Sequence, residues 1–129
     1  RISQPRSWAL PIRPRDIWSD DIKDPDYNLM GTRPTLFHHE RLFRPDHLYD
    51  LVIITNWNWP YAVKGRGSAI FIHSWRKKGY PTEGCVALSK ENLLKVAKFI
   101  DFGSRLIVPE ALHAHQRWPS QLGYGLLQN

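Results

Sequence analysis

Residues 65–73 read GRGSAIFIH and residues 81–88 read PTEGCVAL, and these two segments decide the expected fold. Each contains a short apolar run typical of a buried strand. The first run ends at His73, and the second follows Cys85, the only cysteine of the chain. An imidazole and a thiol on neighbouring strand ends can form a base and nucleophile pair. The pairing indicates acyl transfer.

Further elements are predicted on both sides of this pair. Residues 51–55, LVIIT, predict a buried strand, and residues 105–108 predict another. Ser89 is a good N-cap for a helix between them. That helix would carry one apolar face and stop at a glycine: Leu93, Ala97, Ile100 and then Gly103. The proline-rich first 45 residues are expected to be extended segments and loops packed on the later core.

Composition bounds the class of protein. The 129 residues suit one globular domain, and 42% of them are hydrophobic. A single cysteine excludes an internal disulfide and a cysteine-rich zinc site. The formal charge of +6 favours an anionic partner such as a cell-wall polymer, a nucleic acid or a lipid surface. No apolar stretch approaches the roughly 20 residues that span a bilayer, and we expect no membrane span and no signal peptide in this chain.

Two segments only superficially resemble metal sites. His39 and Glu40 begin an H-E-x-x-H motif, but Phe43 stands where the second histidine is needed. Residues 24–28 resemble the start of a calcium loop, but Leu29 replaces its glycine. We therefore expect no metal site in these segments.

The alternative for Cys85 is a buried structural thiol, which is common for free cysteines. Gly84 favours the reactive interpretation, because it leaves room for a substrate carbonyl beside the backbone. The Cys85 amide could then donate to a developing oxyanion. The group that orients His73 stays open at this point among four candidates: the side chains of Asp50, Asn58 and Glu83, and the backbone carbonyl of Ser74.

A basic cluster lies in the loop between the two residues of the pair and consists of Arg76, Lys77 and Lys78. These cations could lower the pKa of Cys85 or hold a substrate carboxylate. A solvated surface loop is the alternative.

Residues 65–73 and 81–88 together closely resemble the L,D-transpeptidase (YkuD-like) catalytic domain, above all a branch with a Thr-x-Gly-Cys-Val-Ala-Leu motif. The resemblance covers most of residues 1–109, the expected catalytic domain, and leaves 110–129 as an unmatched tail. Its upstream part rests on ten positions: Trp18, Asp20, Asp21, Tyr27, Asn28, His39, Glu40, Leu48, Tyr49 and Asp50.

The resemblance implies a mostly β domain, sandwich-like or barrel-like, with one or two short helices. It implies Cys85 as nucleophile, His73 as base, and the backbone of Gly84 and Cys85 as oxyanion donors. We count Ser74 with these catalytic residues, because its carbonyl could orient His73. The thiolate would attack the third residue of a peptidoglycan stem peptide and release the terminal D-amino acid, and an amine of a second stem would resolve the thioester. Substrate contacts are expected from Thr82, Glu83, Arg76, Lys77, Lys78 and Asn58, and the location would be periplasmic or otherwise extracytoplasmic. The implied reaction needs neither a metal nor an organic cofactor.

Two departures from the family pattern matter. Many members carry arginine two positions after the cysteine, where this chain has Ala87, so anchoring of the substrate is expected to fall to the basic cluster or to be lost. The strands and the glycine-rich segment that usually open the domain have no counterpart here, so the sequence is expected to be either a fragment or a shortened domain.

Three other functions stay open at the level of sequence. A hydrolytic relative would act as an L,D-carboxypeptidase or as an amidase on peptidoglycan-protein links. A noncatalytic basic module would bind an anionic polymer, although dispersed charge disfavours nucleic acid. The sequence predicts no oligomeric state.

Overall fold

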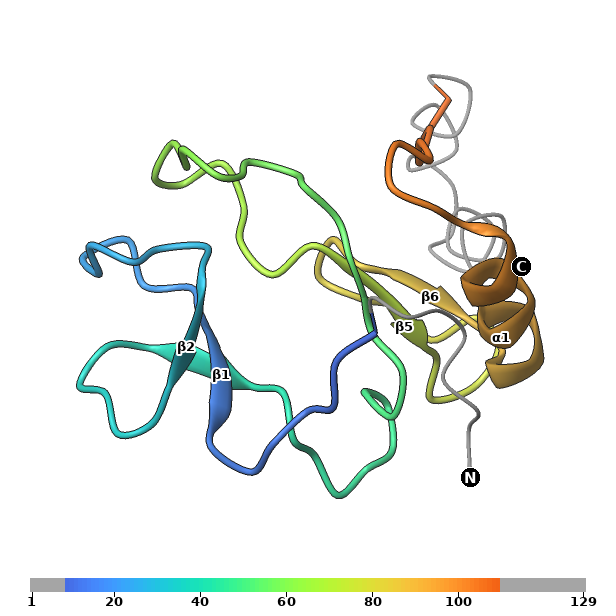
Figure 1. Ribbon diagram of the computed structural model, residues 1–129, viewed down its shortest axis with the longest axis horizontal. Helices are drawn as coiled ribbons and strands as arrows, with labels where there is room; N and C mark the ends of the chain where they lie inside the picture. The colour runs from blue at the N-terminus through green and yellow to red at the C-terminus, as the bar shows by residue number, and fades with distance from the viewer. Residues whose placement is uncertain (1–8, 110–129) are drawn as a thin grey trace.

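The computed structural model describes residues 9–109 and folds them into two three-stranded sheets and one helix (Figure 1). The first sheet is antiparallel, in the order β2 (Met30–Thr32), β1 (Asp16–Ser19), β3 (His39–Arg41). The second has the order β4 (Ile53–Ile54), β5 (Phe71–Ser74), β6 (Val86–Leu88), followed along the chain by α1 (Lys90–Phe99). The prediction of a mostly β fold with a short helix is confirmed.

The two faces of the second sheet have different neighbours. Strands β5 and β6 are parallel, with Ile72 opposite Val86 and His73 opposite Ala87. Because side chains alternate along a strand, Ile72 and Val86 share one face and His73 and Ala87 the other. The face of Ile72 packs against Leu93 of α1. In Figure 1 the helix lies beside β6, on the side away from the first sheet.

The other face of the second sheet meets the first sheet through aromatic rings. Trp18 of β1 packs edge-on against Phe71 of β5, with ring centroids 5.0 Å apart. Tyr49 contacts the same Phe71 ring at 6.1 Å. Phe71 is 1% exposed, and Cys85 packs against this core cluster. The candidate nucleophile therefore borders the core where the two sheets meet.

The predicted strands around the cysteine and histidine are confirmed, as is the helix. Ser89 caps α1 by accepting a hydrogen bond from the Asn92 amide at 3.1 Å. Leu93 and Ala97 are buried, as the apolar face predicts. The helix ends before the predicted glycine, because the Ile100 backbone has turned to an extended conformation.

One predicted strand is absent, and three strands form where extended segments and loops were expected. Residues 105–108 form no strand: they are exposed and pair with no strand in the described part of the chain. The first 45 residues contain the three strands of the first sheet as well as loops. These strands are only three or four residues long, and all four residues of β1 are buried, so no alternation marks them in the sequence. The predicted tail, 110–129, lies outside the described residues.

No helix among residues 9–109 is long and apolar enough to cross a membrane.

Candidate active site

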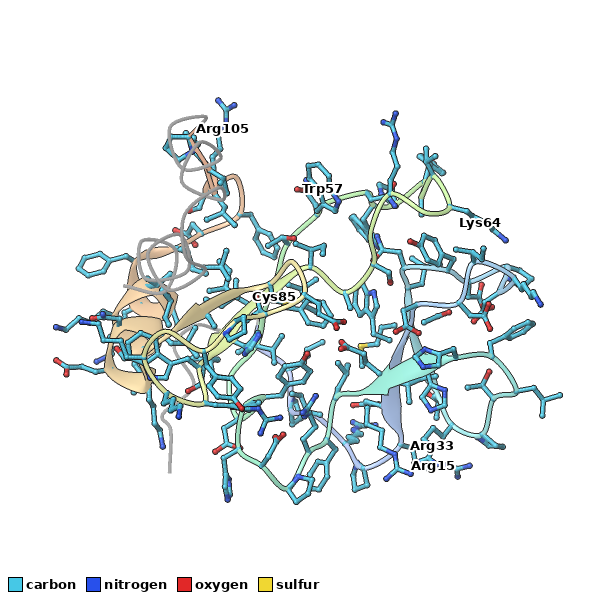
Figure 2. The ribbon with its side chains drawn as sticks, turned by 180° about the vertical axis from the view of Figure 1, so that it is seen from behind. Arg15, Arg33, Trp57, Lys64, Cys85 and Arg105 are labelled. Carbon is cyan, nitrogen blue, oxygen red and sulfur yellow. The ribbon has the colours of Figure 1, made fainter. Side chains whose placement is uncertain are left out.

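Cys85 lies directly before β6, on a turn that depends on Gly84. Gly84 has φ +102°, a conformation that residues with a side chain rarely adopt. A Cβ there would also lie 3.2 Å from the Ile70 Cδ1 atom. The Thr82 hydroxyl donates a hydrogen bond to the Cys85 carbonyl oxygen and closes the turn. Figure 2 shows Cys85 in the middle of the molecule, between the helix and the first sheet.

The thiol of Cys85 is held by the backbone that leads into β5. It donates a hydrogen bond to the Ala69 carbonyl oxygen at 3.1 Å and accepts one from the Phe71 amide at 3.5 Å. Burial raises the pKa of the Cys85 thiol, and the charge of Glu40 adds to the rise. The resting residue is therefore a neutral thiol at neutral pH.

His73 of β5 is buried and held in one tautomer. Its Nδ1 atom lies 2.7 Å from the Ser74 carbonyl oxygen. Because a carbonyl oxygen only accepts, Nδ1 carries the proton and Nε2 keeps its lone pair. Burial lowers the pKa of His73, so the ring is neutral at neutral pH. The sequence left four candidates for the group that orients His73. In the structure, the Ser74 carbonyl is the one that is hydrogen-bonded to the ring.

The register of the second sheet relates the two side chains. His73 lies opposite Ala87, which is two residues beyond Cys85 on the neighbouring strand. The side chains of residues two apart point to the same face. Cys85 and His73 therefore share the face that meets the first sheet, as a diagonal pair on adjacent strands.

Asn58, predicted as a substrate contact, has its side chain hydrogen-bonded to the backbone of its own loop. Its side-chain amide donates to the carbonyl oxygens of Val63 and Gly67, both at 2.9 Å, and its side-chain oxygen accepts the Val63 amide at 2.8 Å. These bonds occupy both ends of the amide group. Asn58 shapes residues 58–67 and does not orient His73.

The remaining predicted residues are exposed on the surface. Asp50 is exposed beside His47, at 3.2 Å, and Glu83 is exposed on the turn before Cys85. All three basic residues of the cluster are exposed as well: Arg76 lies 3.6 Å from Asp46, and Lys77 lies over the Tyr80 ring. This cluster does not lower the pKa of Cys85, which burial raises.

Two residues without a predicted role lie at the site, Glu40 and Tyr49. The Tyr49 hydroxyl donates to Glu40 Oε2 at 3.2 Å, and its ring packs against that of His73 with centroids 5.3 Å apart. Burial raises the pKa of both groups. Glu40 and Tyr49 were among the positions that carry the sequence resemblance. No local sequence pattern, however, indicates that Glu40 contacts Tyr49 or that either residue lies near His73.

The surface hollows beside the site have different linings. One, of about 270 Å³, reaches from Asp46 to Ser74, and one of about 390 Å³ includes Glu40 and Arg44. Neither is lined by Cys85 or His73. Within the described range 9–109, no three His, Cys, Asp or Glu side chains gather closely enough to hold a metal ion.

Comparison with known proteins gives one match. The chain matched no curated protein and no solved structure. The YkuD family, described as the L,D-transpeptidase catalytic domain, matches residues 1–108. The chain belongs to the L,D-transpeptidase catalytic-domain family.

Proposed function

We propose that this protein is a peptidoglycan L,D-transpeptidase that works through an acyl-enzyme on Cys85, with residues 1–109 as its catalytic domain. One observation supports this most: Cys85 and His73 share one face of adjacent parallel strands, and the Ser74 carbonyl fixes the ring so that Nε2 can accept a proton. Membership of the family supports the same chemistry.

The first half-reaction forms a thioester. The Cys85 thiol leaves the Ala69 carbonyl by rotation about its Cα–Cβ bond and gives its proton to His73 Nε2. The sulfur attacks the carbonyl of the third stem residue, while the backbone amides of Gly84 and Cys85 stabilise the oxyanion. His73 then passes the proton to the departing amine of the terminal D-amino acid.

The second half-reaction decides the product. An amine of another stem gives a crosslink, and water gives a trimmed stem, as in an L,D-carboxypeptidase. A thioester suits both steps, because it is more readily aminolysed than an ester or amide. The substrate places the protein outside the cytoplasm, and neither half-reaction calls for a metal or organic cofactor.

Contacts with the stem peptide are proposed for exposed charged residues near Cys85 in the sequence. Glu83 and the basic cluster (Arg76, Lys77, Lys78) are exposed to solvent. Thr82 contributes indirectly, by holding the Cys85 carbonyl. Ala87 is 1% exposed and packed in the core, so the anchoring arginine of other family members has no equivalent at that position.

Intact-mass spectrometry tests the proposal. The protein is incubated with tetrapeptide muropeptides and, separately, with a carbapenem, and any adduct is mapped by peptide analysis. We expect an adduct on Cys85, absent in Cys85→Ala, together with crosslinked or trimmed muropeptides. A folded wild-type protein that gives neither adduct nor product would contradict the proposal and favour a noncatalytic polymer-binding module.

A further inference from the structure

Glu40 lies on the inner side of the first sheet. Its Cα is paired with Trp18, and directly paired residues of two strands point to the same face. Trp18 uses that face to pack on Phe71 of the second sheet. The Glu40 side chain therefore leaves the first sheet in the direction of the strands that carry His73 and Cys85.

The Glu40 carboxyl group keeps one oxygen free. Oε2 accepts the Tyr49 hydroxyl, and no hydrogen bond or ion pair within residues 9–109 engages Oε1. The neighbouring cation, Arg44, lies over the Tyr49 ring at 4.9 Å and is bound to Asp46 at 2.6 Å. Within the described residues the carboxyl is thus half-buried without a cation of its own, which is a costly arrangement for a charged group.

Tyr49 joins this carboxyl group to the reacting pair. Its ring contacts His73, and the Cys85 side chain packs on the cluster that contains Tyr49. The negative charge of Glu40 disfavours the Cys85 thiolate and raises its pKa. A carboxylate here hinders the formation of the nucleophile, so the first half-reaction does not account for it.

We propose that Glu40 binds the amine of the acceptor in the second half-reaction and so favours aminolysis of the thioester over hydrolysis. The inference rests on the proposed acyl-enzyme. A cation fits this place, because the free oxygen of a half-buried carboxylate makes a charge-assisted hydrogen bond to an ammonium group. Water gains no such contact, so the carboxylate distinguishes the two acceptors.

Proton balance gives Glu40 a second task. The acceptor arrives as an ammonium ion and loses two protons on becoming an amide. One proton returns through His73 to the Cys85 sulfur as the carbon–sulfur bond breaks. Glu40 accepts the other and releases it to water. Burial raises the pKa of Glu40, which makes it a better acceptor than an exposed carboxylate.

The test compares Glu40→Gln with wild type and with Glu91→Gln, an exposed carboxylate on α1. Glutamine can still accept the Tyr49 hydrogen bond but has no charge. The measured quantities are the rate of Cys85 acylation by a carbapenem and the ratio of crosslinked to trimmed muropeptide at several acceptor concentrations. We expect Glu40→Gln to acylate at least as fast as wild type, with a crosslinked-to-trimmed ratio about tenfold lower and a raised acceptor KM. Glu91→Gln should match wild type.

Tyr49→Phe is the second variant, because it keeps the carboxylate but removes its hydrogen-bond donor. We expect a smaller fall in the ratio, about two- to threefold. Unchanged ratios in both variants, with normal acylation, would overturn the role of Glu40 and leave the acyl-enzyme intact. Absence of any adduct in wild type would overturn the acyl-enzyme and this inference with it.

Discussion

The Cys85 thiol donates a hydrogen bond to the Ala69 carbonyl oxygen, 3.1 Å away. Ala69 itself has φ +57°, which is unusual for a residue with a side chain. Its amide is held by the Asn28 side-chain oxygen at 3.1 Å. The position of the Cys85 thiol therefore depends on a strained residue that a buried asparagine from the loop after β1 holds in place.

Asn28 should be the most sensitive structural residue of the site. It is 2% exposed, and its side chain also accepts from Trp18 and donates to the carbonyls of residues 57 and 58. Asn28→Ala would leave these groups unpaired and cost about 2–4 kcal/mol of stability. Urea unfolding measures the loss, with exposed Asn56→Ala as the matched control. Equal midpoints for the two variants would show that Asn28 does not hold the sheets together.

Gly84 should be required both for folding and for reactivity. In Gly84→Ala the left-handed backbone and the contact with Ile70 should cost about 1–3 kcal/mol and slow acylation of Cys85. Gly65→Ala is the control, because Gly65 has φ +86° and open space around it. It should lose about 1 kcal/mol for the backbone alone. Acylation as fast in Gly84→Ala as in Gly65→Ala would argue against a role of this turn in catalysis.

His73 should set the acid limb of the pH profile. Because burial lowers its pKa, the ring stays neutral and able to accept a proton at neutral pH, and stronger acidification is needed to protonate it than for an exposed histidine. The acylation rate should therefore be level around neutral pH, fall only on acidification, and rise again at alkaline pH, where the raised pKa of Cys85 is approached. Carbapenem acylation followed by mass spectrometry from pH 5 to about 10 records the profile.

Replacement of His73, the proposed base, should remove the acid limb of the profile. His73→Ala should lower the plateau about 10²- to 10⁴-fold and abolish the acid limb, whereas exposed His47→Ala should keep the wild-type profile. A wild-type profile that instead declines above neutral pH would reveal a thiolate–imidazolium pair in place of the neutral thiol and ring.

The helix cap should affect stability without affecting chemistry. Ser89→Ala removes the acceptor for the Asn92 amide and should cost about 1 kcal/mol. Ser89→Asp keeps a capping oxygen and should restore most of this. Because α1 packs on the face of the second sheet away from His73, the acylation rate at a temperature where all variants are folded should not change. A fall in that rate would indicate coupling between the two faces.

Local patterns were sufficient for the second sheet and its helix. Each element there is indicated by a pattern within a few residues. The strands are indicated by apolar runs before His73 and after Cys85, and the helix by a serine cap ahead of Leu93 and Ala97 at helical spacing. The two side chains proposed for the chemistry adjoin these runs, so the place of His73 in β5 and of Cys85 directly before β6 followed from the sequence. The failed strand at residues 105–108 shows the limit, because an apolar run without a pairing partner does not form a ladder.

Sequence by itself determined the family, the mostly β class and the two residues of the proposed nucleophile and base pair, because all of these lie in short continuous segments. Only the tertiary structure decided how they are surrounded. The bond from Ala69 to Asn28 spans 41 residues, and that from Ser68 to the Ser19 carbonyl spans 49. The contact of Glu40 with Tyr49 joins a strand to a loop. Such contacts form when separate segments pack together, and no periodicity or cap within one segment encodes them.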